Sequence, residues 1–146
     1  MELDCTLVYG DLTSISEMRN LEILVLSENA SIVGHLSSLS SLLKLQRLYL
    51  RNTSVQGDLE CISMLESLWM IDLHGTRVHG NLESIAKLRN LQQAFLGNTE
   101  LEGSILSLWA LENMSLLQIK NTAINPTDVE KLEFQSKHPW CILALE

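Results

Sequence analysis

A few side chains in the sequence could in principle hold a metal ion. His74 and His79 lie close together in the chain, and His35 or Asp72 could complete a set of ligands. Imidazole and carboxylate groups bind zinc only when the fold brings three or four of them to one point. These residues occupy different positions of the repeat described below, and no Cys or Asp at ligand spacing accompanies them. We therefore expect no metal site and no cofactor.

Residue patterns that carry catalysis are missing from the sequence. It contains no glycine-rich phosphate loop, no H-E-x-x-H and no G-x-S-x-G. The protein is therefore not expected to be an enzyme.

The cysteines and the first residues bear on the compartment. Cys5, Cys61 and Cys141 fall in separate repeats where no two lie side by side. Unpaired thiols favour a reducing, intracellular compartment, because secreted repeat proteins often close their ends with paired cysteines. The opening residues 1–4 lack the basic and apolar regions of a signal peptide, and no apolar run reaches the roughly 18 to 20 residues of a membrane span. We expect an intracellular protein without membrane insertion.

The chain is acidic, with a net charge of −8, and it is 46% hydrophobic and 19% charged. That apolar content is sufficient for a packed interior. Nucleic acids and anionic membranes are bound by clustered Lys and Arg, which neutralise phosphates. The net negative charge therefore argues against nucleic acid as a partner and favours other proteins.

One unit of sequence is repeated along the chain. Residues 45–67 and 68–90 align position by position, a step of 23 residues (68 − 45). The shared pattern is L-x-x-L-x-L-x-x-T-x-V-x-G-x-L-x-x-I-x-x-L-x-x, and a fixed period of this length indicates a solenoid. We divide the single domain 1–146 into a partial repeat 1–20, repeats 21–44, 45–67, 68–90 and 91–113, and a terminal repeat with a cap, 114–146.

Each part of the unit predicts a local structure. The L-x-x-L-x-L segment predicts a short strand whose residues face the core and the open side in turn. A polar column follows, whose side chains can bond backbone groups as the chain turns away. This structural polar ladder comprises Thr6, Asn29, Thr53, Thr76, Thr99 and Thr122. A glycine column comes next, where we expect a positive φ or a close backbone approach. Apolar residues at every third position then predict 3-10 turns.

The two ends of the chain differ. Thr127 and Glu130 form a capping-box pattern that starts a helix, His138-Pro139 ends it, and residues 140–146 predict a final edge strand. A polar cap of this kind replaces a missing neighbouring repeat. No such cap is expected at the front, where apolar residues would form an open end. This end either docks on a partner or on preceding repeats, or is covered by a few further residues. These N-terminal docking residues are Leu3, Val8, Leu12, Ile15 and Met18.

This pattern resembles the leucine-rich repeat family over nearly the whole chain. Strand segments in phase begin at Leu21, Leu45, Leu68, Leu91 and Met114. The V-x-G-x-L portion is similar to the plant-type subclass, although the proline is absent, Thr mostly replaces Asn and the unit is one residue shorter. The resemblance implies an α/β solenoid with protein recognition through its concave face. We expect a curved, single parallel sheet on that face, short 3-10 or irregular helical turns on the convex side, and a C-terminal capping helix and strand.

Positions on the open face of the predicted strands are candidates for partner contact. Tyr49, Met70 and Phe95 form a semi-apolar stripe there, and Tyr, Met and Arg are enriched at interface centres. Arg51 and Lys120 lie beside the stripe and could position an acidic partner segment. Single exposed apolar side chains are also ordinary in folded proteins. The full candidate set is Ile23, Val25, Arg47, Tyr49, Arg51, Met70, Asp72, His74 and Phe95.

The sequence therefore predicts a non-enzymatic protein-interaction module or scaffold that binds a protein through its concave sheet. Tyr49, Met70, Phe95 and Arg47 are the expected anchors. Two alternatives stay open. One is a structural subunit built permanently into a larger complex through the uncapped N-terminal end. The other is the recognition domain of a receptor-like protein, which glycosylation at a sequon such as Asn113-Met-Ser115 would favour.

Overall fold

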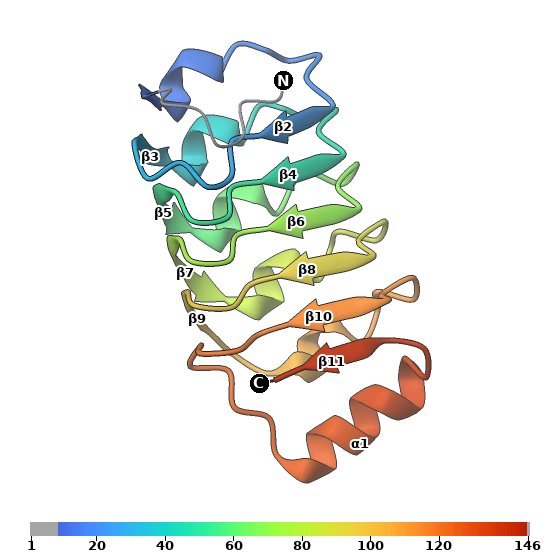
Figure 1. Ribbon diagram of the computed structural model, residues 1–146. Helices are drawn as coiled ribbons and strands as arrows, with labels where there is room; N and C mark the ends of the chain where they lie inside the picture. Colours follow the sequence, from blue (N-terminus) through green and yellow to red (C-terminus); the bar gives the residue numbers. More distant parts are fainter. Residues whose placement is uncertain (1–8, 146) are drawn as a thin grey trace.

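The protein is a solenoid of stacked coils, as a computed structural model that describes residues 9–145 shows (Figure 1). Each full coil contributes one strand to each of two sheets and then one 3-10 helix, before the next coil repeats the course. Neighbouring coils therefore lie side by side along the whole array.

The first sheet contains the strands that the L-x-x-L-x-L segments predict. Its order is β2–β4–β6–β8–β10–β11, and every neighbouring pair is parallel. The strands are β2 (Ile23–Val25), β4 (Arg47–Tyr49), β6 (Met70–Asp72), β8 (Gln93–Phe95), β10 (Leu116–Gln118) and β11 (Ile142–Ala144). The middle residue of each strand from β2 to β10 is buried, so its two neighbours lie on the opposite, concave side.

The predicted parallel sheet on the concave side is present, but a second parallel sheet beside it was not expected. Its order is β1–β3–β5–β7–β9. The strands are β1 (Gly10–Asp11), β3 (Ile32–His35), β5 (Ser54–Asp58), β7 (Arg77–Asn81) and β9 (Glu100–Glu102). In β5, Val55 and Gly57 are buried between more exposed neighbours, which is the alternation of a half-buried strand. The V-x-G portion of the repeat therefore forms a strand as well as a turn.

Short 3-10 helices carry the chain from the second sheet to the next coil, as the spacing of apolar residues predicts. They are η1 (Leu12–Ile15), η2 (Leu36–Leu39), η3 (Leu59–Ile62), η4 (Leu82–Ile85) and η5 (Ile105–Leu108). The polar residue that follows each glycine is the N-cap, and its side chain accepts a hydrogen bond from the backbone N–H two residues later. These caps are Asp11, His35, Asp58, Asn81 and Ser104.

Rows of leucine fill the interior, and a polar column runs beside them. The hydroxyls of Thr53, Thr76 and Thr122 each donate to the carbonyl three residues earlier, at 2.7, 2.7 and 2.8 Å. Thr99 makes the same bond, and Asn29 accepts from the backbone N–H of Ser31 at 3.2 Å. Each bond satisfies a backbone group at the point where the chain leaves the concave sheet.

The N-terminal end differs from the expectation of an open apolar surface. Leu12 is 1% exposed and Ile15 is 6% exposed, so neither is available to dock a partner. Both lie in η1, which packs on η2, and they occupy the same core rows as Leu36 and Leu39. Met18 is exposed. The other residues named for the polar ladder and this end, Thr6, Leu3 and Val8, lie outside the described residues.

The C-terminal cap forms as the sequence predicts. Helix α1 (Asp128–Lys137) starts at a capping box, in which the Thr127 side chain accepts from the Glu130 backbone N–H and the Glu130 carboxylate accepts from the Thr127 backbone N–H. Phe134 is its one fully buried side chain. Strand β11 then pairs with β10 and completes the first sheet. Within residues 9–145, no helix is both long enough and apolar enough to cross a bilayer.

Gly34→Ala should lower the free energy of unfolding by about 1–3 kcal/mol, because the backbone there is strained for any side chain. Gly34 has a φ of +125°, and an added Cβ would lie 2.8 Å from the backbone nitrogen of Leu12. Gly10→Ala is the matched control, since a Cβ at that position meets nothing within 4 Å. Urea unfolding of both variants measures the difference. Equal stability of the two variants would contradict the close packing of coils at this column.

Acid should weaken the C-terminal cap through His138, which is 3% exposed and packs 4.6 Å from the Phe134 ring. Burial, with the charge of Lys137, lowers the pKa of His138 below its usual 6.5, and the Leu108 carbonyl offsets only part of this. As the pH falls below about 6.5, the unfolded chain binds a proton that the folded chain does not, so stability falls until the folded pKa is reached. Urea unfolding at pH about 7.5 and about 5.5 should show a smaller loss for His138→Leu than for the native chain.

Candidate functional site

The candidate residues lie in three adjacent columns on the concave side of the first sheet. Backbone pairing sets Arg47 beside Met70 and Tyr49 beside Asp72, and it continues from Asp72 to Phe95. Ile23 and Val25 extend the first two columns onto β2. The third column follows the strands and contains Arg51, His74 and Lys120. The repeat register therefore brings the whole candidate set onto one face.

These side chains differ in how accessible they are. Ile23, Val25, Arg47, Tyr49 and Phe95 are partly exposed, as an open-face position requires. Met70 and Asp72, by contrast, are only 6% and 7% exposed. Met70 therefore does not provide the exposed anchor that its position predicts.

Asp72 is the centre of a fixed polar cluster. One of its carboxylate oxygens accepts from Nε of Arg51 at 2.9 Å, and the other accepts from the backbone N–H of His74 at 3.1 Å. The Arg51 guanidinium carbon also lies 5.9 Å from the centre of the Phe95 ring. The Arg51 side chain keeps an exposure of 33%, so a partner can reach it while the hydrogen bond to Asp72 orients it.

Arg47 is held in a different way, against an aromatic ring that sequence reasoning did not select. Its guanidinium carbon lies 5.6 Å from the centre of the Trp69 ring, and Arg47 makes no ion pair within the described part of the chain. The corresponding positions in the neighbouring repeats are Gln46, Gln92 and Ser115. A lone Trp in a polar column was the signal that could have identified it.

A second polar ladder runs along the rim of the concave sheet, and the sequence analysis missed it. Asn52, Asn98 and Asn121 have φ of 53°, 53° and 55°, in the left-handed region that asparagine tolerates. The amide of Asn121 donates to Asn98 at 2.8 Å, and that of Asn52 donates to the Glu28 carboxylate at 3.0 and 3.1 Å. In three repeats an Asn directly precedes the Thr of the first polar ladder, and this recurrence was the sequence signal for the second ladder.

The histidines and cysteines within residues 9–145 lie apart from one another. Among residues 9–145, no three His, Cys, Asp or Glu side chains gather in a way that could hold a metal. His79 lies 4.0 Å from Asp58 on the second sheet, whereas His74 is on the concave side. Cys61 and Cys141 are free thiols, and burial raises the pKa of Cys141 to about 11. A thiol that stays protonated at neutral pH is a poor nucleophile.

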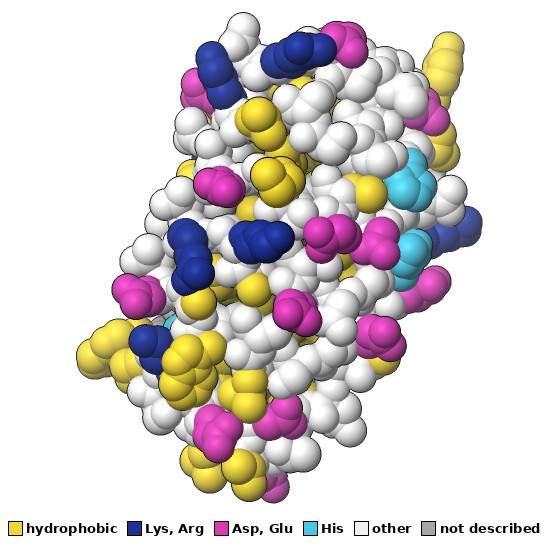
Figure 2. Space-filling model, turned by 180° about the vertical axis from the view of Figure 1, so that it is seen from behind, with side chains coloured by type: hydrophobic (Ala, Val, Ile, Leu, Met, Phe, Trp, Pro, Cys, Tyr) yellow, Lys and Arg dark blue, Asp and Glu magenta, His cyan; other side chains and the backbone are white. Residues whose placement is uncertain are grey.

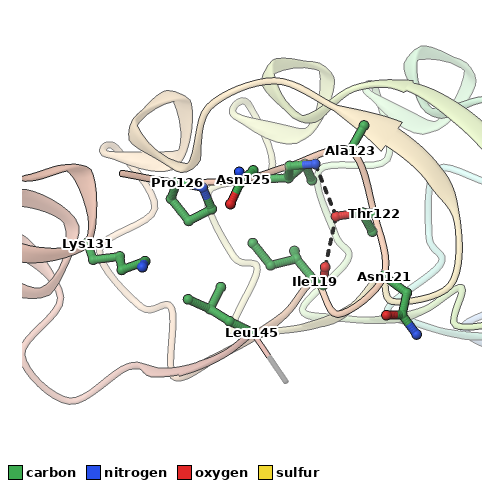
Figure 3. Close-up of a pocket in the computed structure, with 9 residues that line it drawn as sticks. Ile119, Asn121, Thr122, Ala123, Asn125, Pro126, Lys131 and Leu145 are labelled. Carbon is green, nitrogen blue, oxygen red and sulfur yellow. Dashed lines mark hydrogen bonds between the residues drawn. The ribbon is translucent and has the colours of Figure 1, made fainter. Parts of the chain in front are cut away.

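A hollow of about 600 Å³ lies at the C-terminal end of the solenoid (Figure 3). The loop that leaves β10 forms one wall, where the Thr122 hydroxyl donates to the Ile119 carbonyl and accepts from the Ile124 backbone N–H. Lys131 and Leu145 line the opposite side, and the Lys131 amine is paired with Asp128 at 2.9 Å. Of the described residues, Lys131 is the one ionisable side chain that lines this hollow, so the hollow does not bring an acid and a base together.

Comparison with known proteins identifies the fold. No protein-family model and no curated protein matches the sequence, but solved structures do. The ectodomain of the plant membrane receptor kinase GASSHO1/SCHENGEN3 from Arabidopsis thaliana matches 81% of this chain and 17% of its own, with a TM-score of 0.64 and 26% identity. The ectodomain of the receptor kinase SOBIR1 from the same plant matches 82% and 66%, with a TM-score of 0.70 and 24% identity. Internalin C2 from Listeria monocytogenes matches 94% and 66%, with a TM-score of 0.65 and 19% identity.

These matches and the 23–24-residue units show that the chain has the α/β solenoid fold of leucine-rich repeat proteins. The chain spans between about one sixth and two thirds of the length of the three compared proteins. Two of the three are ectodomains of plant receptor kinases. They give no support to the prediction of an intracellular, reducing compartment.

Asp72→Ala should cost about 1–3 kcal/mol of stability, because it leaves the backbone N–H of His74 and the Arg51 guanidinium without their buried acceptor. Asp72→Asn keeps an acceptor for one of these donors and should lose less. Urea unfolding of the two variants and the native chain measures the difference. If Asp72→Ala loses no more unfolding free energy than Asp72→Asn, the cluster contributes little to the stability of the fold.

Proposed function

We propose that the protein is a non-enzymatic protein-interaction module that binds an extended, acidic segment of a partner protein across its concave sheet. The observation that carries this proposal is the pair of arginines at cation–π distance from aromatic rings, Arg47 with Trp69 and Arg51 with Phe95. Both lie on one face of a sheet whose strands run side by side.

These two arginines suit an anionic partner. A guanidinium that is already oriented beside a ring loses less freedom when it binds, and its edge presents donors in a fork that matches a carboxylate. The Asp72 carboxylate satisfies part of Arg51, while Arg47 has no ion-pair partner within residues 9–145. In a chain of net charge −8, this face is therefore a local cationic site. It would attract and orient acidic side chains.

Tyr49 and Phe95 supply the apolar part of the contact. They lie on β4 and β8, on either side of β6, and both are partly exposed. Aromatic side chains of this kind contribute a large contact area at little cost in conformational entropy. A segment that crosses the parallel strands would contact Tyr49, the Arg51 cluster and Phe95 in succession.

The compared structures support the general class. The GASSHO1/SCHENGEN3 ectodomain was solved in complex with CASPARIAN STRIP INTEGRITY FACTOR 2, so one solenoid of this type has a recorded binding partner. Because fold does not specify a partner, the partner of this chain is inferred only from its own side chains. The ectodomain matches also favour the receptor-like recognition domain over the structural subunit as the second candidate.

A Tyr49→Asp, Phe95→Asp double variant should lose its partner, because it removes both apolar contacts and adds negative charge beside the two arginines. The matched control is Leu43→Asp with Met64→Asp, which places the same two charges on exposed apolar positions away from the strands. Native extract passed over each protein, followed by quantitative mass spectrometry, should show a binder that the native chain and the control retain and the concave variant loses. Equal retention by both variants would rule out the concave face as the binding site.

The preference for acidic segments has its own test on the captured protein. Arg47→Glu should weaken binding at least about tenfold, whereas Arg77→Glu, the same change at an exposed residue of β7, should have little effect. Added salt should reduce the affinity of the native chain more than that of Arg47→Glu, because ions screen an attraction that the variant lacks. An equal salt dependence would contradict the role of Arg47.

A further inference from the structure

The C-terminal cap presents an apolar outer surface. Of the residues in helix α1, Val129 is 64% exposed and Leu132 is 72% exposed, and Trp140, just after the helix, is 90% exposed. Figure 2 shows hydrophobic side chains gathered at the lower left, the end of the molecule that carries α1. A terminal cap normally replaces the missing neighbour with a polar face. This cap covers the core and exposes a new apolar surface.

Helical periodicity shows which residues share that surface. Phe134 faces the solenoid core, and at 100° per residue the opposite side of α1 carries Val129, Leu132 and Ser136. The Ser136 hydroxyl donates to the Glu133 carbonyl at 2.7 Å, so this small side chain needs no other partner. A small residue at one end of an apolar stripe allows a second helix to approach closely.

The charged residues of α1 indicate which molecule can bind to this surface. The protein carries a net charge of −8, which makes two copies repel each other at most faces. Helix α1 is close to neutral, because Lys131 and Lys137 nearly balance its three acidic residues. Glu133 and Lys137 are both exposed, and neither makes an ion pair within the described residues. Each therefore remains able to pair with another chain.

We propose that the occupant is a second copy of this chain, bound through an antiparallel α1–α1 contact. A two-fold axis at the level of Gln135 sets Glu133 of one copy opposite Lys137 of the other, and the symmetry makes this pair twice. The same register brings Trp140 of each copy toward the Val129 and Leu132 stripe of its partner. The charged pairs fix the antiparallel direction, while the apolar side chains provide the affinity.

The dimer leaves the concave sheet free, because α1 lies at the end of the solenoid (Figure 1). Two concave faces would then act together, and a partner with two acidic segments would bind more tightly than to a single copy. The dimer itself does not depend on the proposed function of that sheet.

Sedimentation equilibrium of the native chain between about 1 and about 500 μM tests the dimer. We expect a concentration-dependent monomer–dimer equilibrium, and Leu132→Glu should weaken it at least about tenfold. The Tyr49→Asp, Phe95→Asp variant should dimerise like the native chain, which separates this proposal from the function of the concave sheet. A native chain that stays monomeric throughout the range would overturn the proposal.

A pair of charge variants tests the register. Glu133→Lys places two lysines in each copy at the contact, and Lys137→Glu places two glutamates there, so each variant alone should stay monomeric. Mixed in equal amounts, the two should form a heterodimer, because every lysine then faces a glutamate of the other chain. Thermal unfolding of each variant confirms that it is folded. If either variant alone forms a dimer as tight as the heterodimer, the antiparallel contact proposed here is excluded.

Discussion

Each coil of the solenoid buries its leucines only against the coils on either side, and the rest of the structure depends on this stacking. A single coil leaves one face of its leucine row open to water, so stability comes from the contact between neighbours. The contact requires that corresponding residues of successive coils lie in register, as the parallel pairing of both sheets shows. A surface of this protein is therefore a set of columns, each with one residue from every coil.

The columns explain why so much of the fold follows from the sequence. Period, strand positions, 3-10 turns and the capping helix depend on side-chain types that recur at fixed spacing. The second sheet was missed because four of its five strands contain a glycine, such as Gly57, whose φ of 121° also suits a turn. Leu12 and Ile15 were misjudged for another reason. An incomplete repeat shows no partner in its own sequence, although its leucines pack on the next coil as any other leucines do.

The concave site could be located from the sequence only in part. The repeat register determines which residues face the open side. Whether such a side chain is exposed to solvent also depends on the size of the side chains on the adjacent strands. Met70 faces the concave side and is still buried, and Asp72 lies beneath the Arg51 side chain. The contact between Arg47 and Trp69 joins a strand residue to one that precedes the next strand. No periodic rule predicts such a pair, since it depends on the reach of two particular side chains.

The same register constrains how a partner can bind. Parallel strands present their side chains in columns that run across the strands. A segment bound along such a column would contact one residue from each coil in turn. In this chain one such column carries Val25, Tyr49, Asp72, Phe95 and Gln118. The apolar residues of the column are separated by Asp72, whose charge Arg51 compensates. Without Arg51 this carboxylate would repel an acidic segment at the centre of the face. The ion pair thus makes the column compatible with a negative partner, and Arg47 beside it supplies a positive charge that makes no ion pair within residues 9–145.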